Sequence, residues 1–120
     1  MPEDALLDGS TLAGLRELGA VEFENLVRLY LEDGAARVAA LREAAGEGDA
    51  HAIAQLAHSL KGSSGAFGAM ALADSCAELQ VAASSGDLAT ALPLIDAVGA
   101  GFERASRALR LRLSRDSNRR

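Results

Sequence analysis

Apolar residues recur along this chain at spacings of three and four, and no segment alternates apolar and polar residues with a period of two. That pattern predicts amphipathic helices and no strands. Glycine-containing polar stretches divide it into five helical segments. We expect a short helix from Ser10 or Thr11 to Gly19, then longer helices at about 21–45, 49–68, 70–83 and from Asp87 onwards.

Each long segment carries an apolar stripe that predicts which residues face the core. The second helix presents Phe23, Leu26, Val27, Tyr30 or Leu31, Val38 and Leu41. The third presents Ile53, Leu56, Leu60, Ser63 or Ser64, and Phe67. The fourth presents Leu72, Cys76, Leu79 and Ala83, and the fifth presents Leu88, Leu92, Ile95, Val98, Phe102, Leu109 and Leu113. Four such helices joined by short polar turns indicate an all-α, antiparallel four-helix bundle, with the short first helix as a lid.

Turn residues and helix breakers set the boundaries within this pattern. Glu47-Gly48-Asp49 and Ser85-Gly86-Asp87 each end one helix and supply an aspartate as the N-cap of the next. Pro93 cannot donate to the carbonyl four residues back, so the fifth helix either kinks there or starts at Thr90. Gly34 weakens the middle of the second helix by up to ~1 kcal/mol.

The composition indicates a single domain over residues 1–120, with frayed ends at about 1–9 and 114–120. Hydrophobic residues make up 49% of the chain but aromatic residues only 3%, so close contacts between small and branched aliphatic side chains must fill the core. Cys76 is the single cysteine, which excludes an intramolecular disulfide and is typical of a reducing compartment. No secretion signal is apparent, and no apolar run approaches the ~18–20 residues that a membrane span needs. We expect a soluble, cytoplasmic monomer with no membrane contact.

Charge is unevenly distributed. Seven of the 12 basic residues are arginines that follow Glu103, with only Asp116 opposing them, whereas the net charge of the whole chain is −5. Cations at the C-terminal end of a helix complement its dipole, and this is our preferred interpretation. Nucleic-acid binding is disfavoured, because no aromatic residues accompany the arginines and the rest of the chain is acidic.

The candidate chemistry lies in the run from His58 to Ala69. His58 comes two positions after the inward-facing Leu56, about 200° around the helix axis, so its side chain should point into water. The residues that share its exposed side lie three, four or seven positions away and are Ala54, Gln55, Lys61, Gly62 and Gly65. An exposed histidine with one cation beside it is suited to act as a nucleophile on a group that another protein brings.

Lys61 is the only lysine in a chain with eleven arginines. Its compact charge on a flexible stem suits a phosphoryl group held one turn away. A neutral imidazole offers a free nitrogen lone pair, so it can accept a phosphoryl group and later release it. A nearby cation and a metal ion of the partner would stabilise the charge of that group.

The small residues around the histidine predict a docking surface. Gly62 and Gly65 each weaken a helix by ~0.5–1 kcal/mol, which makes sense if the backbone of another protein must come close. We assign Gln55, Gly62 and Gly65 to this surface. The alternative is that the glycine- and serine-rich stretch is a flexible loop, but Phe67 continues the apolar stripe and favours a helix.

His51 lies seven residues before His58, nearly on the same face. A two-histidine metal site needs a spacing nearer four and a third ligand, and only Asp49 is close by. We therefore interpret His51 as a solvated side chain and expect no metal site. Cys76 is interpreted as a small buried apolar residue.

The motif His58-x-Leu60-Lys61-Gly62-Ser63-Ser64, followed by Gly68-Ala69, Cys76 and Gln80, resembles the histidine-containing phosphotransfer (HPt) domain of bacterial and fungal phosphorelays. The resemblance extends from the second helix through the fifth. It implies a four-helix bundle whose exposed histidine is phosphorylated on Nε2 and shuttles the group between the aspartates of two receiver domains. The implied partners are response-regulator receiver domains and a hybrid sensor histidine kinase.

By that resemblance His58 is the phosphoryl acceptor, Lys61 stabilises the phosphoryl oxygens, and Gln80 bonds the imidazole and fixes its orientation. Some members carry a second cation one turn after that glutamine, where this chain has Ser84. No Gly-x-x-x-x-Gly-Lys nucleotide loop is present. We therefore expect a phosphoryl carrier and not an enzyme, with no cofactor of its own and with Mg²⁺ supplied by the partner receiver domain.

Two other functions stay open. A binding-only bundle that sequesters a receiver domain predicts a disrupted histidine motif, and this motif is intact. The phosphorylatable N-terminal module of a chemotaxis-type kinase requires a much longer chain, and this one ends at Arg120.

Overall fold

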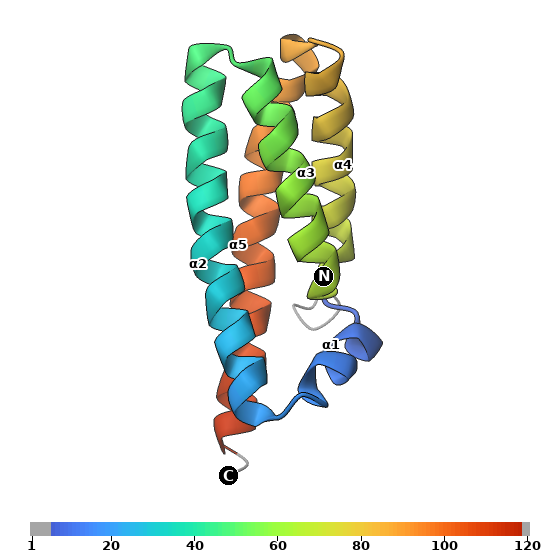
Figure 1. Ribbon diagram of the computed structural model, residues 1–120, viewed down its shortest axis with the longest axis vertical. Coiled ribbons are helices and arrows are strands. Elements are labelled where there is room, and N and C mark those ends of the chain that lie inside the picture. Colours follow the sequence, from blue (N-terminus) through green and yellow to red (C-terminus); the bar gives the residue numbers. More distant parts are fainter. Residues whose placement is uncertain (1–5, 119–120) are drawn as a thin grey trace.

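The computed structural model describes residues 6–118, and these form five helices (Figure 1). They are α1 (Gly9–Arg16), α2 (Ala20–Glu47), α3 (Ala50–Ala66), α4 (Met70–Ser84) and α5 (Leu88–Asn118). Helices α2 to α5 run alternately up and down as an antiparallel bundle, and α1 lies at the end where α3 finishes (Figure 1). No strand occurs between residues 6 and 118, so the all-α bundle prediction is confirmed. Within the same range, no helix has both the length and the apolar content that crossing a lipid bilayer requires.

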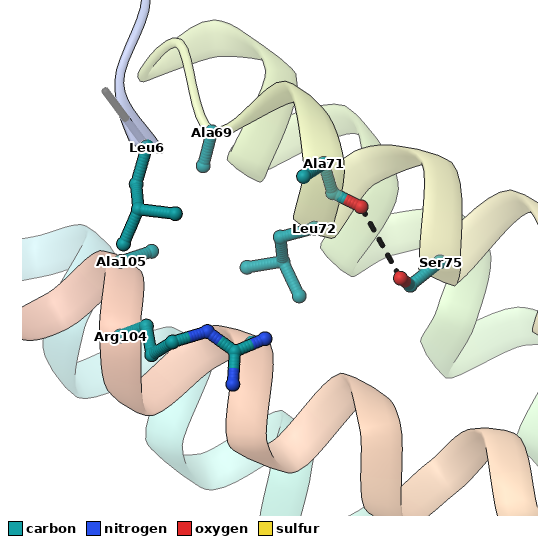
Figure 2. A pocket seen from close by; sticks show the side chains of 8 residues that line it. Leu6, Ala69, Ala71, Leu72, Ser75, Arg104 and Ala105 are labelled. Atoms are coloured by element: carbon teal, nitrogen blue, oxygen red, sulfur yellow. Dashed lines mark hydrogen bonds between the residues drawn. The ribbon is translucent and has the colours of Figure 1, made fainter. Parts of the chain in front are cut away.

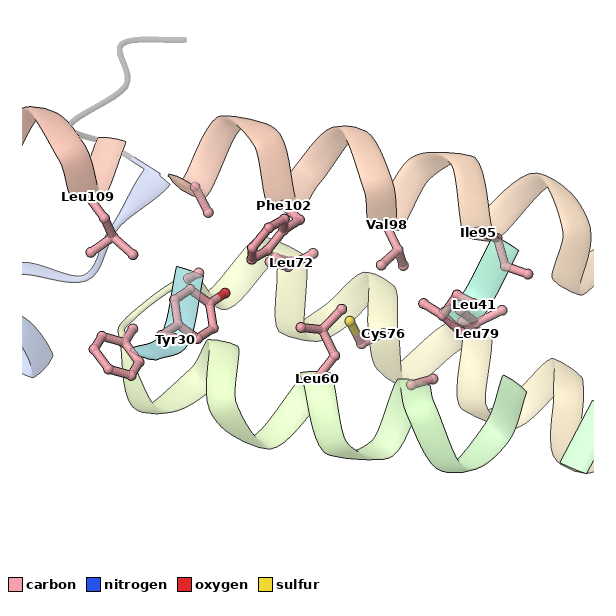
Figure 3. Packing of buried hydrophobic residues seen from close by; sticks show 14 of the residues in the cluster. Tyr30, Leu41, Leu60, Leu72, Cys76, Leu79, Ile95, Val98, Phe102 and Leu109 are labelled. Carbon is pink, nitrogen blue, oxygen red and sulfur yellow. The ribbon is translucent and has the colours of Figure 1, made fainter. Parts of the chain in front are cut away.

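The core consists mainly of aliphatic side chains (Figure 3), and four aromatic residues are also buried in it. The ring of Tyr30 stacks on Phe67 with centroids 4.7 Å apart and meets Phe102 edge-on at 5.8 Å. Its hydroxyl lies 2.7 Å from the Oγ of Ser64, a residue with no exposed surface. The two buried hydroxyls therefore satisfy each other, and this bond joins α2 to α3.

Burial also changes the acidity of two core side chains. It raises the pKa of Tyr30 to about 12, against the opposing effect of the hydrogen bond with Ser64. It raises the pKa of the Cys76 thiol to about 11, in agreement with the interpretation of this cysteine as a buried apolar residue. Neither group ionises at neutral pH.

Gly34 has a packing function that helix propensity alone does not reveal. It is buried on α2, and a Cβ atom at this position would lie 2.3 Å from the ring of Phe102 on α5. The absence of a side chain therefore lets α2 approach α5 closely at this level.

Aspartates begin three of the helices. Asp49 and Asp87 accept hydrogen bonds from the backbone N–H groups of Ala52 and Thr90, each at 3.1 Å, so both predicted N-caps are confirmed. Asp8 caps α1 in the same way, which places the start of α1 at Gly9. This helix ends at Arg16, not at Gly19, because Gly19 has a φ of 112° and serves as the N-cap of α2.

Of the two alternatives given for Pro93, the start of α5 at Thr90 is wrong. The helix begins at Leu88, because Asp87 already supplies the partner for the Thr90 N–H, and it continues through Pro93 to Asn118. Pro93 is exposed, so the carbonyl that it leaves without a helical donor is close to water.

Residues 6–9 and 114–118 are more structured than expected. Leu7 is only 5% exposed, and the N–H of Asp8 donates to the carbonyl of Gly68 at 2.8 Å, which fixes this segment to the turn between α3 and α4. At the other end, Asp116 pairs with Arg16 at 3.1 Å, and α5 does not stop at residue 114. Residues 1–5 and 119–120 of the predicted frayed ends lie outside the described residues.

Most of the predicted inward residues are buried or half-buried, and one is not. Leu92 is 44% exposed, since the fully buried Ala91 occupies the inward position of that turn. Two ambiguities are resolved in favour of Tyr30 over Leu31 and of Ser64 over Ser63.

Candidate functional site

His58 lies in the middle of α3 with its side chain exposed, as its position relative to Leu56 predicts. Its Nδ1 is 3.4 Å from the Oε1 of Gln80 on α4. An amide oxygen only accepts hydrogen bonds, so this contact requires the proton on Nδ1, and in the neutral ring the lone pair is then on Nε2. The antiparallel pairing of α3 and α4 therefore brings together two residues that lie 22 positions apart, and it leaves Nε2 as the nucleophilic nitrogen.

An open hollow of about 650 Å³ surrounds this pair. From α3 it is lined by His51, Ala54, Gln55, His58 and Ser59, and from α4 by Gln80 and Ser84. Of the residues assigned to docking, Gln55 is thus at the site. Ser59 was not predicted, because it lies beyond the stripe of residues that shares the exposed side of His58.

Lys61 follows His58 by one helical turn, and it is half-buried where full exposure was expected. Half-burial is usual for a lysine, because its apolar stem can cover neighbouring surface while the charged end stays in water. It lies on α3 within reach of a group attached to the imidazole of His58.

Residues 62–65 are helical, because α3 continues to Ala66, so the loop alternative is wrong. Ideal Cβ atoms built on Gly62 and Gly65 would have no atom of another element within 4 Å. The packing of the bundle therefore does not require glycine at either position. Their assignment to a docking surface stays a prediction.

His51 is exposed at the edge of the same hollow as His58. Among residues 6–118, no three His, Cys, Asp or Glu side chains come together as a metal site would require. His51 and His58 are the two ionisable residues that line the hollow, and Lys61 is not part of the lining. Ser84, one turn after Gln80 on α4, also lines it.

A more enclosed cavity lies away from the histidine, where the N-terminal segment meets α4 and α5 (Figure 2). Its volume is about 60 Å³, and its lining includes Leu6, Leu72, Ala105 and the side chain of Arg104. Since one ordered water needs ~10–15 Å³ of such space, this cavity has room for a few waters and for no sizeable ligand. The open hollow at His58 is therefore the better candidate site.

Comparisons with known proteins agree with this site and fold. The model of the Hpt domain family matches residues 25–115, a range that includes His58, Lys61 and Gln80. The crystal structure of histidine-containing phosphotransfer protein B (HptB) from Pseudomonas aeruginosa PAO1 is similar, with a TM-score of 0.88 and 34% sequence identity. The match covers 92% of this chain and 96% of that one. A comparison with curated proteins returned no match.

Proposed function

This chain belongs to the Hpt domain family and acts as a histidine phosphotransfer protein in a phosphorelay, and we propose that His58 is the residue that carries the phosphoryl group. The observation that supports His58 is its contact with Gln80, which holds the proton on Nδ1 and leaves Nε2 free on an exposed surface. No other histidine between residues 6 and 118 has a hydrogen-bond partner of this kind.

The transfer step follows from this geometry. The lone pair of Nε2 attacks the phosphorus of an aspartyl phosphate on a receiver domain, a P–N bond forms, and the P–O bond to the aspartate breaks. The receiver carboxylate leaves with the bonding electrons. The imidazole becomes a cation while it is phosphorylated, and the Oε1 of Gln80 stabilises it by accepting from Nδ1–H. The reverse step passes the group to the next receiver.

Lys61 supports the same step by charge. Its ammonium group stabilises the negative oxygens of the phosphoryl group as they approach His58. In this mechanism the Mg²⁺ that assists the step comes from the receiver domain. The protein has no catalytic activity of its own, and a hybrid sensor kinase with receiver domains provides and removes the group.

The test is phosphorylation by a panel of phosphorylated receiver domains. We expect label in the wild type as a phosphoramidate, which is labile in acid and stable in base, and none in His58→Gln. His51→Gln is the matched control, because it removes the other histidine of the hollow, and it should be labelled like the wild type. Label in His58→Gln at the wild-type rate would exclude His58 as the carrier.

A further inference from the structure

The hollow at His58 lies mainly on one side of the histidine along α3. Three of its lining residues precede His58 on this helix and one follows it directly, and they are His51, Ala54, Gln55 and Ser59. A helical side chain leans toward the N-terminal end of its helix and covers the turn before its own Cα. We therefore expect a phosphoryl group on His58 to lie over the turn of Ala54 and Gln55, close to the last turns of α4.

Gln55 and Lys61 flank the histidine on opposite sides. One lies a helical turn before His58 and the other a turn after it, and all three belong to α3. Three residues correspond to about 300° around the helix axis, so each flanking residue lies about 60° to one side of His58. Lys61 does not line the hollow, and the other α3 residues that line it within one turn of His58 are uncharged. On the Gln55 side, therefore, an uncharged donor of this chain has to bind the phosphoryl oxygens.

The side-chain amide of Gln55 is available as this donor. The residue is exposed, it lines the hollow, and its amide makes no hydrogen bond to residues 6–118. Helical residues three apart have Cβ atoms ~5–6 Å from each other, a distance that the long glutamine side chain can span. An amide NH₂ group offers two donors, and a phosphoryl oxygen is a strong acceptor. Gln80 differs, because its Oε1 already contacts Nδ1 of the ring.

We propose that Gln55 binds the phosphoryl group of phosphorylated His58 directly, by donating from its side-chain NH₂ group to a phosphoryl oxygen. Lys61 and Gln55 then hold the group from opposite sides, one by charge and the other by a hydrogen bond. This inference rests on His58 as the carrier. It goes beyond docking, because a residue that contacts only the receiver has no effect on phosphorylated protein from which the receiver has been removed.

Nuclear magnetic resonance of the side-chain amides tests the contact directly. Gln55 and Gln80 are the only two glutamines in the chain, so Gln55→Ala assigns both NH₂ signals. The wild type is phosphorylated by a receiver domain and then separated from it. We expect the Gln55 NH₂ signal to move on phosphorylation, whereas the signal of the exposed Asn25 on α2 should stay in place. An unchanged Gln55 signal in labelled protein overturns the proposal.

The half-life of the phosphohistidine in the isolated protein is the second measurement. Loss of the donor in Gln55→Ala should shorten the half-life by ~2- to 10-fold, which is the range for one hydrogen bond. Gln55→Glu should shorten it further, because a carboxylate repels the phosphoryl oxygens, and Gln55→Arg should restore or lengthen it. Urea unfolding should change little across the series, because residue 55 is exposed.

Glu78→Gln is the matched control. It raises the net charge by one, as Gln55→Arg does, but Glu78 lines a separate groove between α4 and α5. Its phosphohistidine half-life should differ from that of the wild type by less than ~1.5-fold. Equal lengthening by Glu78→Gln and Gln55→Arg would show a diffuse effect of charge and would overturn the proposal.

Two further outcomes separate this contact from other roles. If Gln55→Ala slows transfer from a receiver but leaves the half-life of the isolated phosphoprotein unchanged, Gln55 contacts only the receiver and the proposal is overturned. Label that persists in His58→Gln at the wild-type rate refutes the carrier itself, and this inference with it. The other adverse results leave His58 in place as the carrier, so the two failures are distinguishable.

Discussion

In the mechanism that we propose, Gln80 orients the imidazole of His58 and Lys61 supplies charge. Gln80 is uncharged and contacts Nδ1 at 3.4 Å, so we expect it to orient the imidazole and to stabilise the phosphorylated ring through one hydrogen bond, without a charge of its own. Lys61 makes no such contact, but it has the charge that the phosphoryl oxygens need. The two residues should therefore affect different steps, with the larger effect on transfer rate at the lysine.

Lys61→Ala should slow phosphoryl transfer, or shorten the lifetime of the phosphohistidine, by ~10-fold or more through the loss of charge stabilisation. Its free energy of unfolding should change by less than about 0.5 kcal/mol, because the side chain is only half-buried. The measurements are rapid-quench transfer from a phosphorylated receiver and urea unfolding. Arg28→Ala, which removes an exposed cation from α2, is the control and should leave transfer unchanged. Equal transfer rates for the wild type and Lys61→Ala would remove the lysine from the mechanism.

At the scale of helices, α3 presents an outer face that is unusually free of side chains. Gly65→Arg places a long side chain two turns along from His58, into space that the bundle leaves open. We expect transfer from a receiver to fall sharply, because the reacting atoms must come within ~3–3.5 Å. The fold should be retained or slightly stabilised, since arginine favours helix more than glycine does.

The control for docking is Gly46→Arg, which makes the same change at an open, exposed position on α2. It should transfer like the wild type. Phosphorylation of Gly65→Arg by a small donor such as amidophosphate, if His58 accepts it, should survive and would separate a blocked surface from a damaged nucleophile. Undiminished transfer from a receiver to Gly65→Arg would place the docking surface elsewhere.

At the contact between α2 and α5, replacement of a glycine should lower stability, whereas replacement of Gly65 should not. Gly34→Ala should destabilise the protein by roughly 1–3 kcal/mol, because its Cβ would lie 2.3 Å from the Phe102 ring and the helices must separate. Gly46→Ala, with no neighbour within 4 Å, should stabilise by up to ~1 kcal/mol through helix propensity alone. Urea unfolding of the two variants checks the opposite signs. Stabilisation by Gly34→Ala would show that α2 and α5 are not packed closely at this level.

For the molecule as a whole, local periodicity predicted the bundle and the exposure of His58, because both depend on which face of a helix is apolar. Features that depend on contacts between distant segments could not be predicted in that way. The fit of Gly34 against Phe102 and the attachment of Asp8 to Gly68 are of this kind. The contact between His58 and Gln80 was predicted from the family resemblance and not from spacing, because the two residues lie 22 positions apart on different helices.

We expect the burial of Cys76 and Tyr30 in the core to make the stability of the protein sensitive to alkaline pH. Burial raises the pKa of Cys76 from 9.0 to about 11 and that of Tyr30 from 10.0 to about 12, so both groups ionise earlier in the unfolded chain than in the folded one. The stabilisation is therefore complete below pH 9 and is lost as pH rises to 12. Each group should contribute roughly 2–3 kcal/mol to this fall.

Tyr30→Phe separates the two contributions. At neutral pH it should lower the free energy of unfolding by ~1–3 kcal/mol, because the buried Oγ of Ser64 loses its partner. Between pH 10 and 12, however, its stability should fall less than that of the wild type, since the phenol that ionises preferentially in the unfolded chain is gone. Urea unfolding curves at several pH values in this window measure both differences. Tyr30→Phe could instead lose as much stability as the wild type over the same interval. Ionisation of Tyr30 would then not cause the fall in the free energy of unfolding, which would have to come from Cys76 and the general rise in negative charge.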